Sequence, residues 1–240
     1  MNITVINGTE QKGCTYAMKE IFLSALGPKN FITEFYLPRD CPHFCAGCKI
    51  CFFHDISECP HAKYTFPIWK NILAADLLVF TSPTYVFHVT AQMKALLDHY
   101  GSKWMSHSPE KPLFSKQAVI ITNAIGAGMG KTARGIQDSL DYWGVARVYT
   151  IKQALFQAEW VKVDSKRKAA VQAACDRVAA KVMGRLHVRP RIKVKALFYA
   201  MKSAQVMIDK SEHRAGRGRT KDYLHWKGNG WLNGKRPWVD

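Results

Sequence analysis

The chain of 240 residues has no apolar run of about 18 residues, the length that a membrane-spanning helix requires. Its first residues also lack the basic stretch and cleavage site of a secretory signal, so we expect a cytoplasmic protein. Acidic residues are scarce: 18 Asp and Glu stand against 35 Lys and Arg, which gives a formal net charge of +17. No nucleic-acid-binding motif accompanies this charge, so the sequence argues against a nucleic-acid partner.

Five short apolar segments alternate with longer amphipathic segments over the first 187 residues. Two of them, Leu77–Thr81 and Ala118–Thr122, are almost continuously apolar, as expected of parallel strands that are buried on both faces. Such alternation predicts right-handed crossovers and an α/β fold with a doubly wound, five-stranded parallel sheet. The predicted strands are Ile3–Asn7, Phe31–Leu37, Leu77–Thr81, Ala118–Thr122 and Arg147–Ala154. The predicted helices are Thr15–Leu26, Phe66–Ala75, Thr90–Tyr100, Lys131–Trp143 and Asp164–Leu186.

Two segments interrupt this alternation. Residues 38–64 form a Cys-rich insertion with several prolines, and residues 188–240 form a basic, aromatic C-terminal extension. We therefore predict one domain over residues 1–187, followed by the extension. Within the extension, Lys193–Ile208 has the pattern of a basic amphipathic helix, which can contact a membrane surface or clasp a second subunit. We prefer the clasp and expect a homodimer or a larger homo-oligomer. The expected anchors of the clasp are Tyr223, Trp226, Trp231, Leu232 and Trp238.

A loop with two glycines follows the first predicted strand and leads into a helix. Gly8 and Gly13 allow the backbone to approach a ligand closely, and the helix N-terminus offers N–H groups to an anion such as phosphate. The loop lacks the Gly-Lys-Ser/Thr ending of a P-loop and the three glycines of the dinucleotide-binding fingerprint. A structural strand-to-helix turn would contain the same glycines, so this loop alone leaves both readings open.

Two further loops follow the third and fourth predicted strands. The first, at residues 81–88, contains Pro83 and the aromatic Tyr85 and Phe87, which could hold a flat ring by stacking. The second, at residues 122–130, is rich in glycine. Because ligands of doubly wound sheets bind at the carboxyl ends of the strands, we expect all three loops to converge on one site.

The segments Gly8–Thr15, Ser82–Tyr85 and Met93–Asp98 together resemble the NADPH-dependent FMN reductase family, and the resemblance covers about residues 1–155. This family belongs to the flavodoxin-like superfamily and includes the iron–sulfur flavoproteins. The resemblance implies a strand order of 2-1-3-4-5, bound FMN, and NAD(P)H as a transient substrate. It implies an FMN phosphate held by Thr9, Gln11, Gly13, Cys14 and Thr15. It implies an isoalloxazine ring along Ser82, Pro83, Thr84, Tyr85 and Val86, with Asn123 to Gly126 completing the site.

The phosphate loop departs from the family pattern at two positions. Glu10 and Cys14 replace the more usual neutral or hydroxyl residues. A carboxylate facing a phosphate would weaken binding, so Glu10 is expected to point away from the site.

Four cysteines in the insertion follow the spacing C-x2-C-x2-C-x7-C. This spacing suits a [4Fe–4S] cluster, in which each of four irons needs a thiolate, and it is similar to the motif of the iron–sulfur flavoproteins. A zinc site is a second interpretation. A metal-free hydrophobic lid over the flavin is a third, and the sequence leaves all three open. The cysteines are Cys45, Cys48, Cys51 and Cys59, and the histidines that could join a zinc site are His43, His54 and His61.

No Ser-His-Asp or paired-carboxylate arrangement stands out, and we assign no catalytic side chain. A flavin enzyme needs none, because the cofactor carries the hydride chemistry. We therefore predict an FMN-dependent NAD(P)H oxidoreductase, of the FMN reductase or quinone reductase type, that passes electrons to a small-molecule or protein acceptor. The alternative is a flavodoxin-like or iron–sulfur electron carrier without steady-state NAD(P)H activity. Other histidines, including His88, His99 and His107, show no paired spacing and are interpreted as structural.

Overall fold

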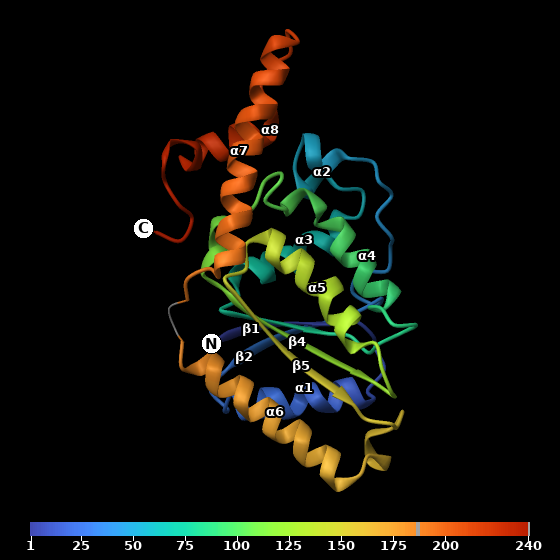
Figure 1. The fold of residues 1–240 in the computed structure, drawn as a ribbon. Helices are drawn as coiled ribbons and strands as arrows, with labels where there is room; N and C mark the ends of the chain where they lie inside the picture. Colours follow the sequence, from blue (N-terminus) through green and yellow to red (C-terminus); the bar gives the residue numbers. More distant parts are fainter. Residues whose placement is uncertain (186–187, 240) are drawn as a thin grey trace.

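A computed structural model describes residues 1–185 and 188–239 (Figure 1). Five parallel strands form one sheet in the order β2-β1-β3-β4-β5, which confirms the predicted fold class and strand order. The order reverses between β1 and β3, where doubly wound sheets bind their ligands. The strands are β1 (Asn2–Asn7), β2 (Phe31–Tyr36), β3 (Leu77–Thr81), β4 (Gln117–Ala124) and β5 (Arg147–Ala154).

Helices cover both faces of the sheet. Helices α1 (Cys14–Ala25) and α6 (Ser165–Met183) lie on one face, while α3 (Ala62–Ala74), α4 (Ala91–His99) and α5 (Met129–Trp143) lie on the other (Figure 1). Successive strand residues point to opposite faces, so the central strands β1, β3 and β4 contribute to two hydrophobic cores. The core under α1 and α6 includes Val5, Val79 and Val119, and the core under α3, α4 and α5 includes Ile6, Phe80 and Ile120.

Several element boundaries differ from the predicted ones. Strand β4 continues to Ala124, beyond the predicted end at Thr122. Helix α3 begins at Ala62, before the predicted start at Phe66, and it contains Pro67, which has no N–H for a main-chain hydrogen bond. Helix α6 ends at Met183 among the described residues, and its predicted end at Leu186 lies outside them.

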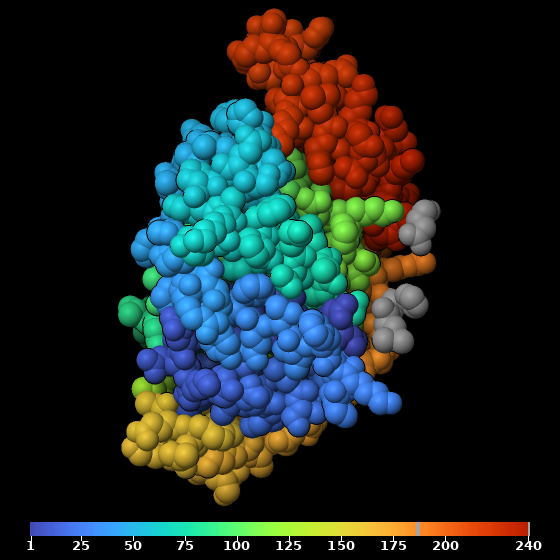
Figure 2. Space-filling model, turned by 180° about the vertical axis from the view of Figure 1, so that it is seen from behind, coloured from blue at the N-terminus to red at the C-terminus, as the bar shows by residue number. Residues whose placement is uncertain are grey.

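The Cys-rich insertion contains short regular elements, namely α2 (Ile50–Phe53) and η1 (Ile56–Glu58). The carbonyl oxygen of Cys51 accepts a hydrogen bond of 2.9 Å from Lys221 Nζ in the C-terminal extension. The ring of Phe52 meets the ring of His107 edge-on, with 4.7 Å between the centroids. The insertion therefore packs beside the extension, where the two lie together at one end of the molecule (Figure 2).

The extension contains α7 (Ile192–Arg214), α8 (Lys221–Gly228) and η5 (Trp231–Asn233). It builds a third hydrophobic core with the body of the protein, and two predicted anchors of a subunit clasp, Trp226 and Trp231, are buried there against their own chain. The outer half of α7 projects from the body (Figure 1). The predicted domain boundary after His187 lies outside the described residues. The buried members of the third core are Met105, Phe114, Val194, Phe198, Trp226 and Trp231.

Polar contacts fix the extension at the amino ends of the strands. Asp141, buried near the end of α5, forms ion pairs with Arg191 and with Lys193, the latter at 2.7 Å. The main-chain N–H of Arg191 donates to the carbonyl of Ala146, the residue before β5. Among the described residues, no helix has the length and apolar character needed to cross a membrane. The remaining short 3₁₀ turns are η2 (Gly101–Lys103), η3 (Lys111–Ser115) and η4 (Trp160–Lys162).

Candidate active site at the carboxyl edge of the sheet

A cavity of about 780 Å³ opens at the carboxyl ends of β1, β3, β4 and β5. This volume lies within the range of about 300–1,000 Å³ that is typical of small-molecule sites. The loops after four different strands meet there, so the strand order itself brings together residues that are far apart in the sequence. The lining residues are Thr9, Gln11, Lys12, Gly13, Cys14, Thr15, Pro83, Thr84, Tyr85, Asn123, Ala124, Ile125, Gln157, Ala158, Glu159, Trp160 and Val161.

The start of α1 forms one end of the cavity. Its N-cap residue is Gly13, no side chain caps the helix, and its first turn contains no acidic residue. The free N–H groups of this turn, together with the helix dipole, favour an anion at that place. Glu10 is exposed and does not line the cavity, so its carboxylate does not oppose an anion there.

Cys14 and Thr15 join this helix start to the neighbouring loops. The Cys14 thiol lies 3.4 Å from the carbonyl oxygen of Ala158, and Thr15 Oγ1 donates a short hydrogen bond to Asn123 Oδ1. Burial raises the pKa of Cys14, more than a main-chain hydrogen bond lowers it, so the thiol stays neutral at pH 7. A neutral thiol does not repel a phosphate, so the departure from the family pattern at Cys14 is compatible with an anion site.

Gly8 allows the loops after β1 and β3 to touch. Its N–H donates to the carbonyl of Thr81 at 2.7 Å, and its carbonyl accepts from Thr90 Oγ1 at 2.7 Å. A Cβ atom at this position would lie 2.8 Å from the Thr81 oxygen, so any larger residue would push the two loops apart.

A partly buried ion pair braces the end of β1. Lys19 Nζ lies 2.6 Å from Glu34 Oε2, which also accepts hydrogen bonds from Asn7 and Tyr36. Burial acts to raise the pKa of Glu34, but the hydrogen bonds from Lys19, Asn7 and Tyr36 outweigh it and hold that pKa below its usual value. Asn7 Oδ1 in turn accepts from Thr81 Oγ1, so the network fixes β1 against β3 where the loops begin.

Hydrogen bonds also fix the loop after β3. The N–H of Thr84 donates to the carbonyl of Asn123 at 2.9 Å, and Thr132 Oγ1 donates to Thr84 Oγ1 at 3.0 Å. Gly128 starts α5 with a φ of 100°, and a Cβ there would lie 2.8 Å from Thr84 Cγ2. Glycine at this position therefore permits the close approach of the two loops.

A tight turn at Tyr85–His88 projects beside the cavity. Tyr85 and His88 exchange two main-chain hydrogen bonds, and the residues between them, Val86 and Phe87, have φ values of 48° and 64°. Left-handed backbone is unfavourable for residues other than glycine, and especially for a β-branched valine. The turn thus holds backbone strain next to the site, and its side chains are largely exposed.

The cavity gathers most of the predicted site residues. Three of them do not line it. Ser82 is fully buried, where its hydroxyl accepts from the N–H of Thr90 at 3.1 Å and donates to the carbonyl of Pro83 at 2.9 Å. Val86 is 92% exposed at the tip of the turn, and Gly126 is exposed in the loop after β4. The predicted residues in the lining are Thr9, Gln11, Gly13, Cys14, Thr15, Pro83, Thr84, Tyr85 and Asn123.

The fourth wall of the cavity, at Gln157–Val161, was missed by the sequence reasoning. This segment follows β5, and the carboxyl end of β5 lies at the same sheet edge as the other loops. The rule that placed the other three loops could have found it, with Trp160 as the signal, since an aromatic residue after a strand can cover a flat ligand.

Residues 1–160, which contain all five strands and nearly the whole cavity, match the family described as NADPH-dependent FMN reductase. The chain belongs to this family. Its members use FMN and NAD(P)H, so the protein is a flavin-dependent oxidoreductase. The cavity fits FMN because it combines uncapped N–H donors and hydroxyls at one end with Tyr85 and Trp160 elsewhere in the lining.

Solved structures show the same fold. An azoreductase from Bacillus anthracis str. Sterne matches with a TM-score of 0.58 and 11% identity, over 76% of this chain and 98% of that chain. An NADH:FMN oxidoreductase in its apo form matches with a TM-score of 0.52 and 20% identity, over 75% and 89%. An NAD(P)H:quinone oxidoreductase from Methanothermobacter marburgensis matches with a TM-score of 0.54 and 15% identity, over 76% and 97%. No curated protein sequence matches the chain.

The Cys-rich insertion does not form a lid over this cavity. None of residues 38–64 lines it, and within the insertion Phe44 and Phe53 are mostly exposed. All four cysteines of the motif are free thiols, with Cys45 and Cys48 exposed and Cys51 and Cys59 half-buried. The lid, one of the three interpretations of this segment, is therefore not what the structure shows, since the insertion contacts Lys221 of the extension and the His107 ring instead of the sheet edge.

Proposed function

We propose that this protein passes electrons from NAD(P)H through bound FMN to a small-molecule or protein acceptor. The observation that carries the proposal is the cavity, which has an uncapped helix start at one end and the hydrogen-bonded loop Pro83–Tyr85 in the same lining. When bound, FMN supplies the hydride and electron chemistry. The side chains of the lining position it, and no catalytic side chain is assigned.

Each part of the lining has a distinct task in this proposal. The N–H groups of the first α1 turn and the Thr9 hydroxyl hold the phosphate. Thr15, whose hydroxyl donates to Asn123 in this structure, would exchange that partner for the phosphate when FMN binds. The main chain around Thr84 and Asn123 holds the ring edge, and Tyr85, which is 48% exposed, lies at the open side. The described residues form only one doubly wound sheet, so NAD(P)H and the acceptor would use this open side in turn.

The rival function is an electron carrier that exchanges electrons with partner proteins and does not turn over NAD(P)H. Carriers commonly have acidic surfaces, and the net charge of +17 favours the oxidoreductase. A purified, yellow protein that oxidises NAD(P)H with a quinone or free FMN as acceptor is the expected result. A protein that retains FMN and is reduced by dithionite, but not by NADH or NADPH, would support the carrier instead.

We also propose a homo-oligomer in the cytoplasm. The outer half of α7 supports an oligomer, because Met207 is 71% exposed and Ile208 is 45% exposed on a helix that projects from the body. This exposed face, rather than the buried tryptophans of the extension, is the surface that a second subunit would cover.

A [4Fe–4S] cluster remains a prediction from the sequence. In its favour, Cys45, Cys48, Cys51 and Cys59 are all free thiols within the one insertion. Among the described residues, however, the four thiols do not form a compact group of potential ligands. The exposure of Cys45 and Cys48 gives less support. Iron and acid-labile sulfide assays on anaerobically prepared protein test it, and about four of each per chain would support it.

A further inference from the structure

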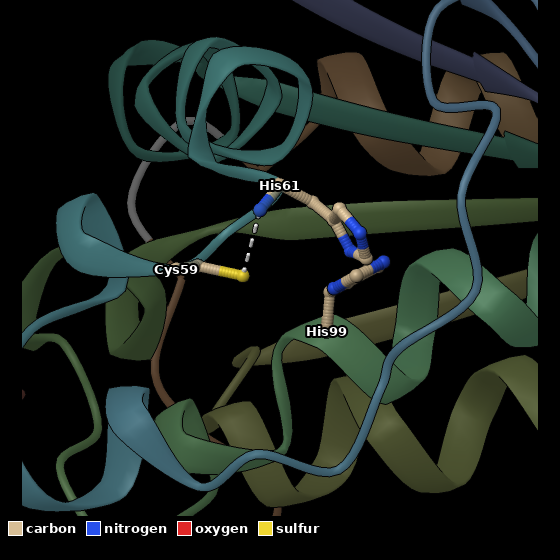
Figure 3. A group of neighbouring side chains, drawn as sticks. All are labelled: Cys59, His61 and His99. Carbon is tan, nitrogen blue, oxygen red and sulfur yellow. Dashed lines mark hydrogen bonds between the residues drawn. The ribbon is translucent and has the colours of Figure 1, made fainter.

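Cys59, His61 and His99 form a compact group outside the flavin cavity (Figure 3). One potential ligand atom from each residue, the thiol sulfur or a ring nitrogen, lies within 4.8 Å of the other two. Among the described residues, this is the only group of three or more Cys, His, Asp or Glu side chains that meets this distance. The group joins residues on either side of Pro60, just before α3, to the last residue of α4.

His99 supplies an independent indication of a ligand. Its side chain is only 3% exposed, and its Nδ1 atom is buried with no hydrogen-bond partner. Its other ring nitrogen, Nε2, lies 3.1 Å from the carbonyl oxygen of His43, which can only accept a hydrogen bond. Nε2 therefore carries the proton, and Nδ1 presents a free lone pair. A buried nitrogen without a partner is costly, and a metal ion would satisfy it.

This arrangement is typical of metal-binding histidines, in which the second ring nitrogen donates to a carbonyl group that fixes the tautomer and the ring orientation. The sulfur of Cys59 also has a supporting contact, since the main-chain N–H of His61 donates to it at 3.4 Å (Figure 3). The His43 ring stacks on the His61 ring, with 4.7 Å between the centroids, and limits its rotation.

We propose that Cys59, His61 and His99 bind one Zn²⁺ ion, with the fourth coordination position open to an exchangeable ligand. One thiolate and two imidazoles suit zinc, whereas magnesium and calcium need oxygen ligands that this group lacks. Ligand atoms around tetrahedral zinc stand roughly 3.5 Å apart, given bonds of about 2.0–2.3 Å. The side chains therefore need to close by only a short distance.

The site would fasten the Cys-rich insertion to α4. Because α4 follows the loop after β3, the ion would link the insertion to the helix that continues from the Pro83–Tyr85 part of the cavity lining. The site also competes with a [4Fe–4S] cluster, since Cys59 cannot serve as the fourth cluster ligand and as the zinc ligand at the same time.

X-ray absorption at the zinc edge of the full-length, FMN-loaded protein tests this proposal, because flavin does not interfere with it. The protein is loaded with Zn²⁺ and dialysed before measurement. We expect one zinc per chain, with one sulfur at about 2.3 Å and two or three nitrogen or oxygen atoms at about 2.0–2.1 Å. A shell of four sulfurs, or a shell of oxygen alone, would overturn it.

Substitutions identify the ligands. Cys59→Ser, His61→Gln and His99→Gln should each weaken zinc binding by roughly 100-fold or more, beyond the effect of losing an outer-shell partner. His54→Gln, a change at an exposed histidine of the same insertion, should leave the affinity unchanged. The triple variant Cys45→Ser, Cys48→Ser, Cys51→Ser should also keep its zinc.

FMN content and circular dichroism verify that each variant is folded. If His99→Gln does not fold, the half-buried His61→Gln and the absorption spectrum of the unmodified protein still decide the question. Zinc retained by folded His61→Gln protein, or lost from the triple cysteine variant, would refute the assignment. Iron and sulfide in place of zinc on freshly isolated protein would refute it as well.

Discussion

Thr9, in the loop after β1, and Thr15, in the first turn of α1, carry hydroxyl groups in the cavity lining, and they test the phosphate assignment. Replacing both by Val keeps the side-chain volume and removes the hydroxyls, and each lost hydrogen bond to a charged group costs about 1.5–3 kcal/mol. We expect the double variant to bind FMN roughly 100-fold more weakly or worse in a fluorescence titration of the flavin-free protein. Thr33→Val, on the edge strand β2, is the matched control. Equal affinity for the double variant and the control would remove the phosphate assignment.

Val86 tests whether the turn beside the cavity is strained. Glycine adopts its φ of 48° without steric cost, so Val86→Gly should raise the free energy of unfolding by about 1 kcal/mol in a urea titration. Val161→Gly is the matched control, because Val161 is also exposed but is not among the residues with positive φ. The Val161→Gly variant should have a slightly lower free energy of unfolding than the unmodified protein. If both variants lose stability equally, the turn holds no strain.

Residue chemistry explains which site residues were predictable. The resemblance to the family predicted Thr9, Thr15, Thr84 and Asn123, and the structure places all four in the cavity lining, because they lie at or beyond the carboxyl ends of neighbouring strands. It placed Ser82 and Val86 on the ring, whereas Ser82 turns inward to hold Thr90. The direction of one side chain in a loop depends on its local hydrogen bonds, which the sequence does not display.

His225 in α8 makes the free energy of unfolding depend on pH. Burial lowers the pKa of His225, more than its hydrogen bond to the Pro109 carbonyl raises it. The unfolded chain, with a histidine pKa of about 6.5, therefore binds a proton more readily than the folded chain. The contribution of neutral, buried His225 to the free energy of unfolding is complete above about pH 6.5. It is lost as the pH falls from there toward the pKa of His225 in the folded chain.

We therefore expect His225→Gln to flatten the decline of unfolding free energy between about pH 7 and pH 5, since glutamine can still donate to Pro109. His213→Gln, at an exposed position near the end of α7, should leave the decline as it is. The measurement is chemical denaturation at several pH values. A slope for His225→Gln equal to that of the unmodified protein would contradict the assignment.

At the scale of secondary-structure elements, the spacing of apolar residues along the sequence decided which element boundaries could be predicted. Strand β3 has the predicted bounds, because a buried parallel strand is recognisable as an apolar run between turn residues. The edge strand β5 also has its predicted bounds, although it contains charged residues and is only half-buried. Helix α3 begins at Ala62, before its predicted start at Phe66. Pro67 favoured the later start, because proline is tolerated best in the first turn of a helix, whereas here it lies inside the helix. The sequence left a lid over the flavin as one of three interpretations of the insertion, and it could not decide between them because the insertion contacts α8, which is distant in sequence.

The C-terminal extension decides the behaviour of the whole molecule in solution. Truncation after His187 would uncover Met105 and Phe114, which are fully buried in the third core. We expect the truncated protein to aggregate or to unfold more readily, because it exposes an apolar patch.

The oligomer itself is tested by Met207→Glu with Ile208→Glu, which changes the exposed end of α7 and leaves the third core intact. Light scattering should show an oligomer for the unmodified chain and a smaller species for this variant. Ile192→Glu, at the other end of α7, is the control. A monomer for the unmodified chain would end the proposal.

The doubly wound parallel sheet was predictable because crossover handedness follows a general rule, and the resemblance to the family supplied the strand order. The third core was not, because its members are separated by up to 126 positions, from Met105 to Trp231. The sequence showed that the aromatic residues of the extension needed a partner, and only the structure shows that this partner is the same chain.

The extension and the flavin cavity lie at opposite ends of the strands. The extension is bound beside Ala146, before β5, and the cavity opens after β5, so the eight residues of that strand separate them by roughly 26 Å. If the protein were immobilised on an electrode or a bead through its C-terminal helices, the opening of the flavin cavity would therefore face the bulk solution. Attachment there would leave the diffusion of nucleotide and acceptor to the flavin unhindered. The C-terminal extension is therefore the suitable point of attachment for an electrochemical sensor.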